Sequence, residues 1–270
     1  MTYSSYQASN PIGIFDSGIG GISLLNAGRS RLPLERWIYV ADMAYLPYGD
    51  KDYDLVRRRA SIISEFLIAS GVKAILVACN TATAISIDHL RSTFPKITFI
   101  GVEPAIKPAV MLSKAKVIGI LATGATTESD RMVALVKRFC ANVNIIIQPC
   151  PGLAELIERG ETKSNEAYQL IRKFVLPMRE KGADVIALGC THYAFASNLI
   201  RKVAGNSIQI LDTSLPVITE LTNQLSKKNL LSAEKRSSVV EVWSTNTEGT
   251  KPPMLVNYMT DDVPVKNIKL

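Results

Sequence analysis

Short apolar runs and amphipathic stretches alternate along most of the chain. The apolar runs have the length and composition of buried parallel strands, and they fall at residues 12–16, 36–40, 74–79, 98–102, 116–121, 145–147, 185–190, 208–211 and 239–245. Stretches with helical spacing lie between them, at residues 22–30, 53–70, 80–91, 128–139, 151–158, 166–181 and 216–228, with a further helix after residue 190. Strands that alternate with helices of this length predict an α/β fold with mostly parallel sheets.

Glycine, proline and loop length mark the ends of several elements. Gly71 ends the helix predicted at 53–70, because glycine readily adopts the left-handed conformation that closes a helix. Pro104 suits a helix start, and Pro177 predicts a bend or break within 166–181. The connection at 41–51 is long for an α/β fold, and loops of this kind at strand ends are often functional.

The second half of the chain repeats a pattern of the first. The segment from Gly13 to Gly18 is echoed 106 residues later, and the strand-end cysteines Cys79 and Cys190 are 111 residues apart. Two pseudo-symmetric α/β domains would bring their strand ends, and both cysteines, to a shared interdomain cleft. We expect the tail, which includes Lys251-Pro252-Pro253, to return to the first domain.

The composition indicates a globular enzyme and narrows the classes of partner. A hydrophobic content of 47% with 20% charged residues argues against disorder. The net charge of +7 permits anionic partners, but the only dense basic clusters, 57–59 and 227–228, are expected on solvated helix faces. No zinc-finger spacing or aromatic-and-basic pattern indicates nucleic acid, and no apolar run approaches the roughly 18 residues of a membrane span.

The four cysteines form no CxxC pair, and the N-terminus lacks an apolar secretory core. Free thiols in a reducing cytoplasm are therefore expected. Cys140 and Cys150 are interpreted as buried small hydrophobic residues, which is the commoner fate of a free cysteine.

Cys79 and Cys190 each lie where a predicted strand ends and a predicted helix begins. Unpaired N–H groups and the helix dipole at such a position favour the thiolate, which can act as a base or nucleophile. One such cysteine suggests covalent catalysis. Two in equivalent positions suggest a two-base racemisation, in which one thiolate removes a proton from a carbon acid and the opposite thiol returns one.

Small polar residues beside the cysteines suit the binding of a carboxylate. Asn80, Thr81 and Thr191 offer side-chain and backbone donors, a role compatible with ordinary helix capping. Ser17 and the glycines after it form a similar candidate cradle for an anion. The glycine-rich run does not fit the dinucleotide or Walker patterns, so a nucleotide site is rejected.

His192 lies two positions from Cys190 and could steady its thiolate or relay protons. Asp16, at a strand end, is a candidate partner for a substrate ammonium or a catalytic thiol. His89 falls on an expected surface helix. A zinc site from Cys79, Cys190 and His192 has suitable ligands but lacks motif spacing, so no metal is predicted.

Five motifs resemble those of the glutamate racemases, within the aspartate/glutamate racemase family, in order and at matching intervals. They are Asp16-Ser17-Gly18-Ile19-Gly20-Gly21, Pro47-Tyr48-Gly49, Cys79-Asn80-Thr81-Ala82-Thr83, Gly101-Val102-Glu103-Pro104 and Leu188-Gly189-Cys190-Thr191-His192-Tyr193. The resemblance covers about residues 12–214. It implies cofactor-independent interconversion of L- and D-glutamate, which supplies D-glutamate for peptidoglycan, and it suggests a homodimer without naming an interface.

The resemblance also implies a domain division and residue roles. The first domain would be 1–103 plus 213–270, and the second 104–212. Cys79 would act on D-glutamate and Cys190 on L-glutamate, assisted by Asp16, His192 and Glu158. The residues implied to hold the substrate are Asp16, Ser17, Tyr48, Gly49, Asn80, Thr81, Thr191 and His192.

Several alternatives stay open at this point. Glu155 competes with Glu158, because the segment at 150–155 departs from the more apolar pattern of the family. The same residues could racemise aspartate or another acidic amino acid, since a fold does not fix a substrate. A racemase-like protein that binds an acidic protein surface is a rival of another class. A hydrolase or transferase would need only one of the two thiols.

Overall fold

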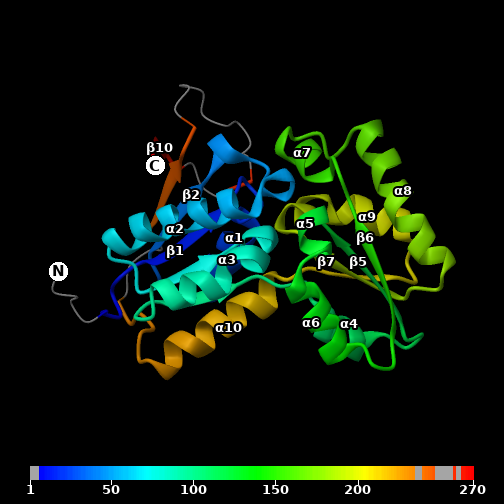
Figure 1. Ribbon diagram of the computed structural model, residues 1–270, viewed down its shortest axis with the longest axis horizontal. Helices are drawn as coiled ribbons and strands as arrows, with labels where there is room; N and C mark the ends of the chain where they lie inside the picture. The colour runs from blue at the N-terminus through cyan, green and yellow to red at the C-terminus, as the bar shows by residue number, and fades with distance from the viewer. Residues whose placement is uncertain (1–5, 235–238, 247–257, 260–262) are drawn as a thin grey trace. The chain divides into compact units, whose positions relative to one another are not determined.

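The computed structural model describes residues 6–234, 239–246, 258–259 and 263–270. The chain divides into two compact units, the first made of residues 1–102 and 214–270 and the second of residues 103–213. Each unit is a parallel sheet covered by helices, as the α/β pattern predicts (Figure 1). The segment Lys251-Pro252-Pro253 lies outside the described residues.

Unit 1 is built on a sheet with the strand order β10-β9-β2-β1-β3-β4, in which all neighbours are parallel. Its strands are β1 (Ile12–Asp16), β2 (Trp37–Ala41), β3 (Ala74–Val77), β4 (Thr98–Gly101), β9 (Val240–Ser244) and β10 (Val265–Asn267). Its helices are α1 (Ile22–Arg31), α2 (Tyr53–Ala69), α3 (Asn80–Thr93) and α10 (Ser214–Lys227), with the 3₁₀ turns η1 (Met43–Tyr45) and η2 (Tyr48–Asp50) in the long loop after β2.

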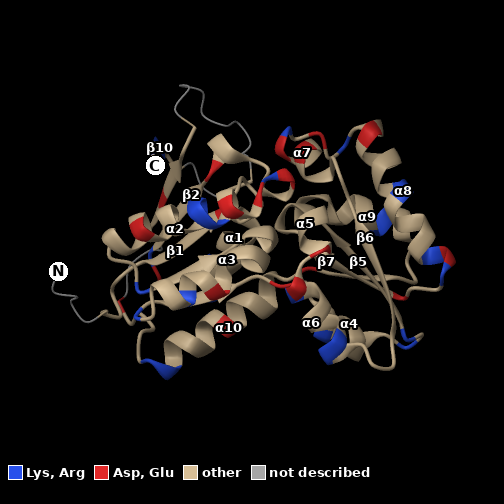
Figure 2. Ribbon diagram, viewed as in Figure 1, with Lys and Arg blue, Asp and Glu red and all other residues tan. Residues whose placement is uncertain are grey.

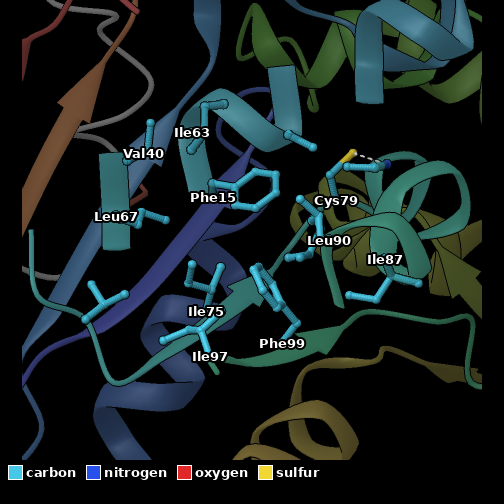
Figure 3. Packing of buried hydrophobic residues seen from close by; sticks show 14 of the residues in the cluster. Phe15, Val40, Ile63, Leu67, Ile75, Cys79, Ile87, Leu90, Ile97 and Phe99 are labelled. Atoms are coloured by element: carbon cyan, nitrogen blue, oxygen red, sulfur yellow. Dashed lines mark hydrogen bonds between the residues drawn. The ribbon is translucent and has the colours of Figure 1, made fainter. Parts of the chain in front are cut away.

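Alternate residues of β2 face opposite sides of the sheet, and helices of unit 1 pack against each side. Ile38 and Val40 pack in an apolar cluster with residues of α2 and α3, part of which is drawn in Figure 3. The neighbouring positions point the opposite way, and the ring of Trp37 lies against Gly28 of α1. The sheet is therefore buried on both sides, which explains why its strands read as continuous apolar runs.

Unit 2 is built on a smaller parallel sheet with the order β6-β5-β7-β8. Its strands are β5 (Val117–Ala122), β6 (Asn144–Pro149), β7 (Val185–Gly189) and β8 (Gln209–Leu211). Its helices are α4 (Ile106–Leu112), α5 (Gly124–Thr127), α6 (Asp130–Phe139), α7 (Leu153–Glu158), α8 (Asn165–Glu180) and α9 (Ser197–Ala204), and the 3₁₀ helix η3 (Thr191–Ala196) follows β7.

The strand order of the two units explains the repeat in the sequence. The order β2-β1-β3-β4 in unit 1 recurs as β6-β5-β7-β8 in unit 2. Strand β1 with Gly13 corresponds to β5 with Gly119, and β3 corresponds to β7. Cys79 and Cys190 follow β3 and β7 respectively, so they hold equivalent topological positions within their units.

The structure corrects four local predictions. Cys190 is followed by the 3₁₀ helix η3 and not directly by an α-helix. Residues 124–127, predicted as part of the connection before a helix, form the short helix α5, and the predicted helix itself is α6, capped by Ser129, which accepts from the N–H of Met132. Pro104 is not the first helical residue of α4, because it lies two positions before Ile106, where the helix begins. Of the bend or break predicted at Pro177, the break does not occur, because helix α8 continues through this residue.

Candidate active site

The candidate residues of unit 1 gather at the carboxyl edge of its sheet. Asp16 is the last residue of β1, Tyr48 lies in the loop after β2, and Cys79 stands between β3 and α3. Strands β2, β1 and β3 are neighbours in the sheet. Parallel strands end at one edge, which is where open α/β sheets bind ligands.

Cys79 caps the N-terminus of α3. Its Sγ atom accepts a hydrogen bond from the backbone N–H of Ala82 at 3.5 Å, drawn as a dashed line in Figure 3. The side chain lies at the edge of the apolar cluster and is 7% exposed. The backbone amide and the dipole of a long α-helix both stabilise negative charge on this sulfur.

Asn80 and Thr81, the first two residues of α3, are buried beside Cys79. Asn80 Nδ2 donates to the carbonyl of Val102 at 3.4 Å. Its Oδ1 atom is buried with no hydrogen-bond partner among the described atoms. A buried acceptor of this kind is unfavourable unless a donor satisfies it, and the N–H group of a ligand would do so.

Asp16 and Ser17 form a tight turn at the end of β1. Ser17 Oγ donates to Asp16 Oδ1 at 3.1 Å, and the N–H of Gly18 donates to the same oxygen at 3.4 Å. Tyr39 Oη donates to the carbonyl of Gly18 at 2.6 Å and holds the turn from the sheet side. A buried carboxylate at a strand end suits the binding of an ammonium group.

Tyr48 is almost completely buried, and its phenol donates to Oδ2 of Asp42 at 2.5 Å. Burial, together with the charge and hydrogen bond of Asp42, raises the pKa of Tyr48 well above its usual value. The phenol is therefore protonated at neutral pH. Gly49 follows it in η2.

The basic cluster at 57–59 is only partly the solvated face that the sequence predicts. Arg58 is exposed and Arg57 pairs with Asp54 near the surface, but Arg59 is 3% exposed. Arg59 forms a two-point ion pair with Asp42, with Nε at 2.9 Å and Nη2 at 2.8 Å from the two carboxylate oxygens. The cluster at 227–228 is exposed, as predicted.

Sequence reasoning missed Asp42 and Arg59. The signal that could have found Arg59 is its helical spacing, because it falls on the same side of α2 as the buried residues Val56 and Ile63. Asp42 directly follows β2 at the carboxyl edge of the sheet, a position typical of functional residues. Neither signal predicts that the two side chains form a pair.

In unit 2 the structure brings together Cys190, His192 and Glu158. His192 Nδ1 lies 3.7 Å from Cys190 Sγ, and His192 Nε2 lies 2.5 Å from Glu158 Oε1. Both Cys190 and His192 are buried, and Thr191 beside them is 4% exposed. The carboxylate orients the imidazole, and the imidazole in turn faces the thiol, an arrangement typical of an activated cysteine.

Burial opposes a charged His192, but hydrogen bonds to Cys190 and Glu158 and the charges of both groups outweigh it. The pKa of His192 is consequently raised well above its usual value. The resulting imidazolium can donate to the sulfur and to the carboxylate at once. This charge stabilises a negative sulfur at Cys190, where the short 3₁₀ helix offers no side-chain capping bond.

The other candidate residues differ in their contacts and burial. The carboxylate that contacts His192 is Glu158, at the end of α7, whereas no such contact is found for Glu155. Cys150 is buried, and burial and the nearby charge of Cys190 raise its pKa, so it persists as a thiol. Cys140 is half-buried and burial also raises its pKa. His89 is exposed on α3.

Charge and composition place few further constraints on the site. Lys and Arg residues are spread over the helices of both units (Figure 2). Among the described residues, no group of three or more His, Cys, Asp or Glu side chains is arranged to hold a metal ion. Within the same part of the chain, no helix is both long and apolar enough to cross a membrane.

The sequence and the fold both match racemases. A family model described as Asp/Glu/Hydantoin racemase matches residues 26–219. A glutamate racemase of Stutzerimonas stutzeri is 43% identical over 223 residues, which cover 83% of this chain and 84% of the relative. The crystal structure of glutamate racemase isoform RacE1 from Bacillus anthracis matches 98% of this chain and 99% of its own, with 25% identity and a TM-score of 0.88.

A second solved structure contains a ligand. The glutamate racemase of Francisella tularensis, in complex with D-glutamate, is 27% identical, covers 97% of this chain and 98% of its own, and has a TM-score of 0.85. A fold of two parallel α/β units with a cysteine after equivalent strands thus defines an enzyme of the racemase class. The chain belongs to the Asp/Glu/Hydantoin racemase family. It is an amino-acid racemase, an isomerase, as its curated relatives are.

Proposed function

We propose that this enzyme interconverts L- and D-glutamate without a cofactor, with Cys79 and Cys190 as the two bases. The observation that carries the proposal is the equivalent position of the two cysteines after β3 and β7, each with its own stabilisation of negative charge. Glutamate is the substrate named for relatives that are 43% and 44% identical to the chain over 223 and 236 residues.

Racemisation needs one proton removed from the α-carbon and one returned on the opposite face. In the direction from D- to L-glutamate, the Cys79 thiolate takes the α-proton and becomes a thiol. The Cys190 thiol gives its proton to the other face of the carbanion and becomes a thiolate, and the reverse reaction exchanges these roles. The interdomain cleft predicted from the sequence would serve this chemistry, because exclusion of water strengthens the electrostatic interactions that stabilise the carbanion.

The neighbouring residues have distinct tasks in this proposal. His192, held by Glu158, stabilises the Cys190 thiolate and can move a proton to or from the sulfur. Asp16 and the buried Oδ1 of Asn80 accept from the substrate ammonium. Ser17, Thr81 and Thr191, with the backbone N–H groups at the starts of α3 and η3, donate to the substrate carboxylates. Tyr48 and Gly49 line the part of the substrate site that contains Cys79.

The cellular role follows from the product. We propose that the enzyme supplies D-glutamate for peptidoglycan and acts in the cytoplasm, where a reducing environment keeps both thiols free. The residue roles and the domain boundaries 1–103 plus 213–270 and 104–212 belong to the same proposal.

The test follows each glutamate enantiomer in deuterated water, by optical rotation and by mass or NMR detection of α-deuterium. A two-base enzyme places solvent deuterium in the product before it appears in the remaining substrate. Cys79→Ala and Cys190→Ala should each abolish racemisation in both directions. Cys140→Ala, a matched control outside the site, should keep wild-type rates.

Two results would contradict the proposal. Absence of rotation change and deuterium uptake with glutamate, but turnover of aspartate, would assign a different acidic substrate to the same site. Racemisation that survives Cys190→Ala in both directions would remove the two-base mechanism.

A further inference from the structure

A buried carboxylate organises the loop that carries Tyr48. Asp42 is completely buried directly after β2, and its N–H donates to the carbonyl of Asp16 at 2.9 Å. Its two oxygens accept four hydrogen bonds, all within 2.9 Å, from Tyr48 Oη, Arg59 Nε, Arg59 Nη2 and Thr245 Oγ1. The donors come from η2, from α2 and from the residue after β9, so one side chain ties three separate segments to the end of β2.

Arg59 supplies the charge that makes this carboxylate tolerable. An unpaired buried carboxylate is strongly unfavourable, whereas a bidentate guanidinium with further donors satisfies it. The guanidinium is itself fixed from other sides, because it lies 4.1 Å above the ring centre of Tyr45 and Nη1 donates to the carbonyl of Leu270 at 2.9 Å. Both partners are therefore held in one geometry.

The hydrogen bonds around Asp42 and Arg59 are connected to the candidate active site through Tyr48. The phenol gives its only proton to Asp42, so its oxygen faces the rest of the site solely as an acceptor. The ring belongs to the same apolar cluster as Cys79. It is close enough that negative charge on the Cys79 sulfur contributes to raising the pKa of the phenol. Displacement of Tyr48 would change both the packing and the polar surroundings of Cys79.

We infer that Asp42 and Arg59 are positioning residues of the Cys79 half of the site, acting through Tyr48. The buried ion pair fixes the Tyr48 ring against Cys79 and the Tyr48–Gly49 backbone at the carboxyl edge of the sheet. The inference rests on the proposed function in one respect, since it takes Cys79 to be a catalytic base.

A double-mutant cycle with Arg59→Met and Tyr48→Phe tests this inference. Each single variant should lower kcat/KM for glutamate by about tenfold per folded active site, because small displacements of groups around a reacting atom are costly. Together they should lower it little more than the worse single variant, because both changes break the same path to Cys79. Arg57→Met is the matched control, since Arg57 lies on the same helix, pairs only near the surface and should keep wild-type kinetics.

A second measurement needs no substrate, and a substitute variant is available if Arg59→Met does not fold. Arg59→Lys keeps the charge but loses the two-point contact with Asp42, and it replaces Arg59→Met if that variant does not fold. The readout is the alkylation rate of each cysteine by iodoacetamide, followed by peptide mass. Loosening of Tyr48 should speed alkylation of the nearly buried Cys79 about threefold or more without changing Cys190.

The outcomes separate the two proposals. A folded Arg59 variant with wild-type alkylation of Cys79, or with losses fully additive to those of Tyr48→Phe, overturns the positioning role. Faster alkylation of Cys79 in a protein whose wild type does not racemise glutamate supports the positioning role and overturns the proposed function.

Discussion

At the scale of single residues, the two cysteines are supported by different chemistry. Cys79 accepts a hydrogen bond from a backbone N–H at the start of α3. Cys190 faces the imidazole of His192, which Glu158 holds in place. The cysteines and their immediate neighbours could be predicted, because strand-end position and adjacency are visible in the sequence. Glu158 lies 34 residues from His192, and only the resemblance pointed to it.

Substitution of Glu158 by glutamine should weaken the Cys190 half of the site. Gln keeps the shape but removes the charge, so the pKa of His192 falls and its imidazolium no longer assists the thiol. We expect kcat/KM to fall by about tenfold or more, measured by optical rotation from both enantiomers. Glu155→Gln is the matched control, and an equal loss in that variant would contradict the role of Glu158.

The same substitution should change how stability depends on pH. The folded-state pKa of His192 is raised above 6.5. Its stabilising contribution is therefore fully present below that value and is lost as pH rises through the folded pKa. The Tm advantage of the wild type over Glu158→Gln should be larger at about pH 6 than at about pH 9. Thermal melts across this range measure it, and an advantage that grows with pH would refute the interpretation.

At the scale of elements, strands were easier to predict than the turns that follow them. Buried parallel strands read as apolar runs, and β1 begins and ends where the pattern predicts. The choice between a 3₁₀ and an α-helix after Cys190 depends on packing and leaves no periodic signal over six residues. Arg59 was misjudged for a related reason, because arginine composition suggested solvent while its place on α2 is buried.

Gly28 should be required for the packing of α1 on the sheet. Alanine normally stabilises a helix interior, but a Cβ atom here would lie 2.6 Å from the Trp37 ring. We expect Gly28→Ala to lower the free energy of unfolding by about 1–3 kcal/mol, measured by denaturant melts. Gly124→Ala, where a Cβ meets nothing within 4 Å, is the control and should be neutral or slightly stabilising.

At the scale of the whole molecule, the domain pattern was accessible because the chain repeats itself, and the repeat in strand order explains the echo in sequence. Ties between distant segments were not accessible. Lys73 forms a buried ion pair with Glu35 and donates to the carbonyl of Ala8, while Glu35 also accepts from the N–H of Ser232 at 2.9 Å. One ion pair therefore connects four segments that are distant in the sequence, around residues 8, 35, 73 and 232, and no local pattern predicts it.

Lys73→Met should destabilise unit 1 strongly. The substitution leaves Glu35 buried without its cation. In comparable buried pairs this lowers the free energy of unfolding by about 3–5 kcal/mol. Adding Glu35→Leu should recover part of this loss, because it removes the stranded charge. Lys266→Met breaks an exposed pair with Glu241 and should cost less than about 1 kcal/mol. Chemical denaturation of all three variants provides the comparison.

The unequal support of Cys79 and Cys190 has a kinetic consequence. Mirror-image substrates have the same free energy, so the equilibrium constant of their interconversion is one, and the Haldane relation makes kcat/KM equal in both directions at every pH and in every variant. The titratable partners of Cys190 therefore cannot bias the enzyme toward one enantiomer. They can raise or lower kcat/KM only equally in both directions, and any difference between the two enantiomers must appear as matched changes in kcat and KM.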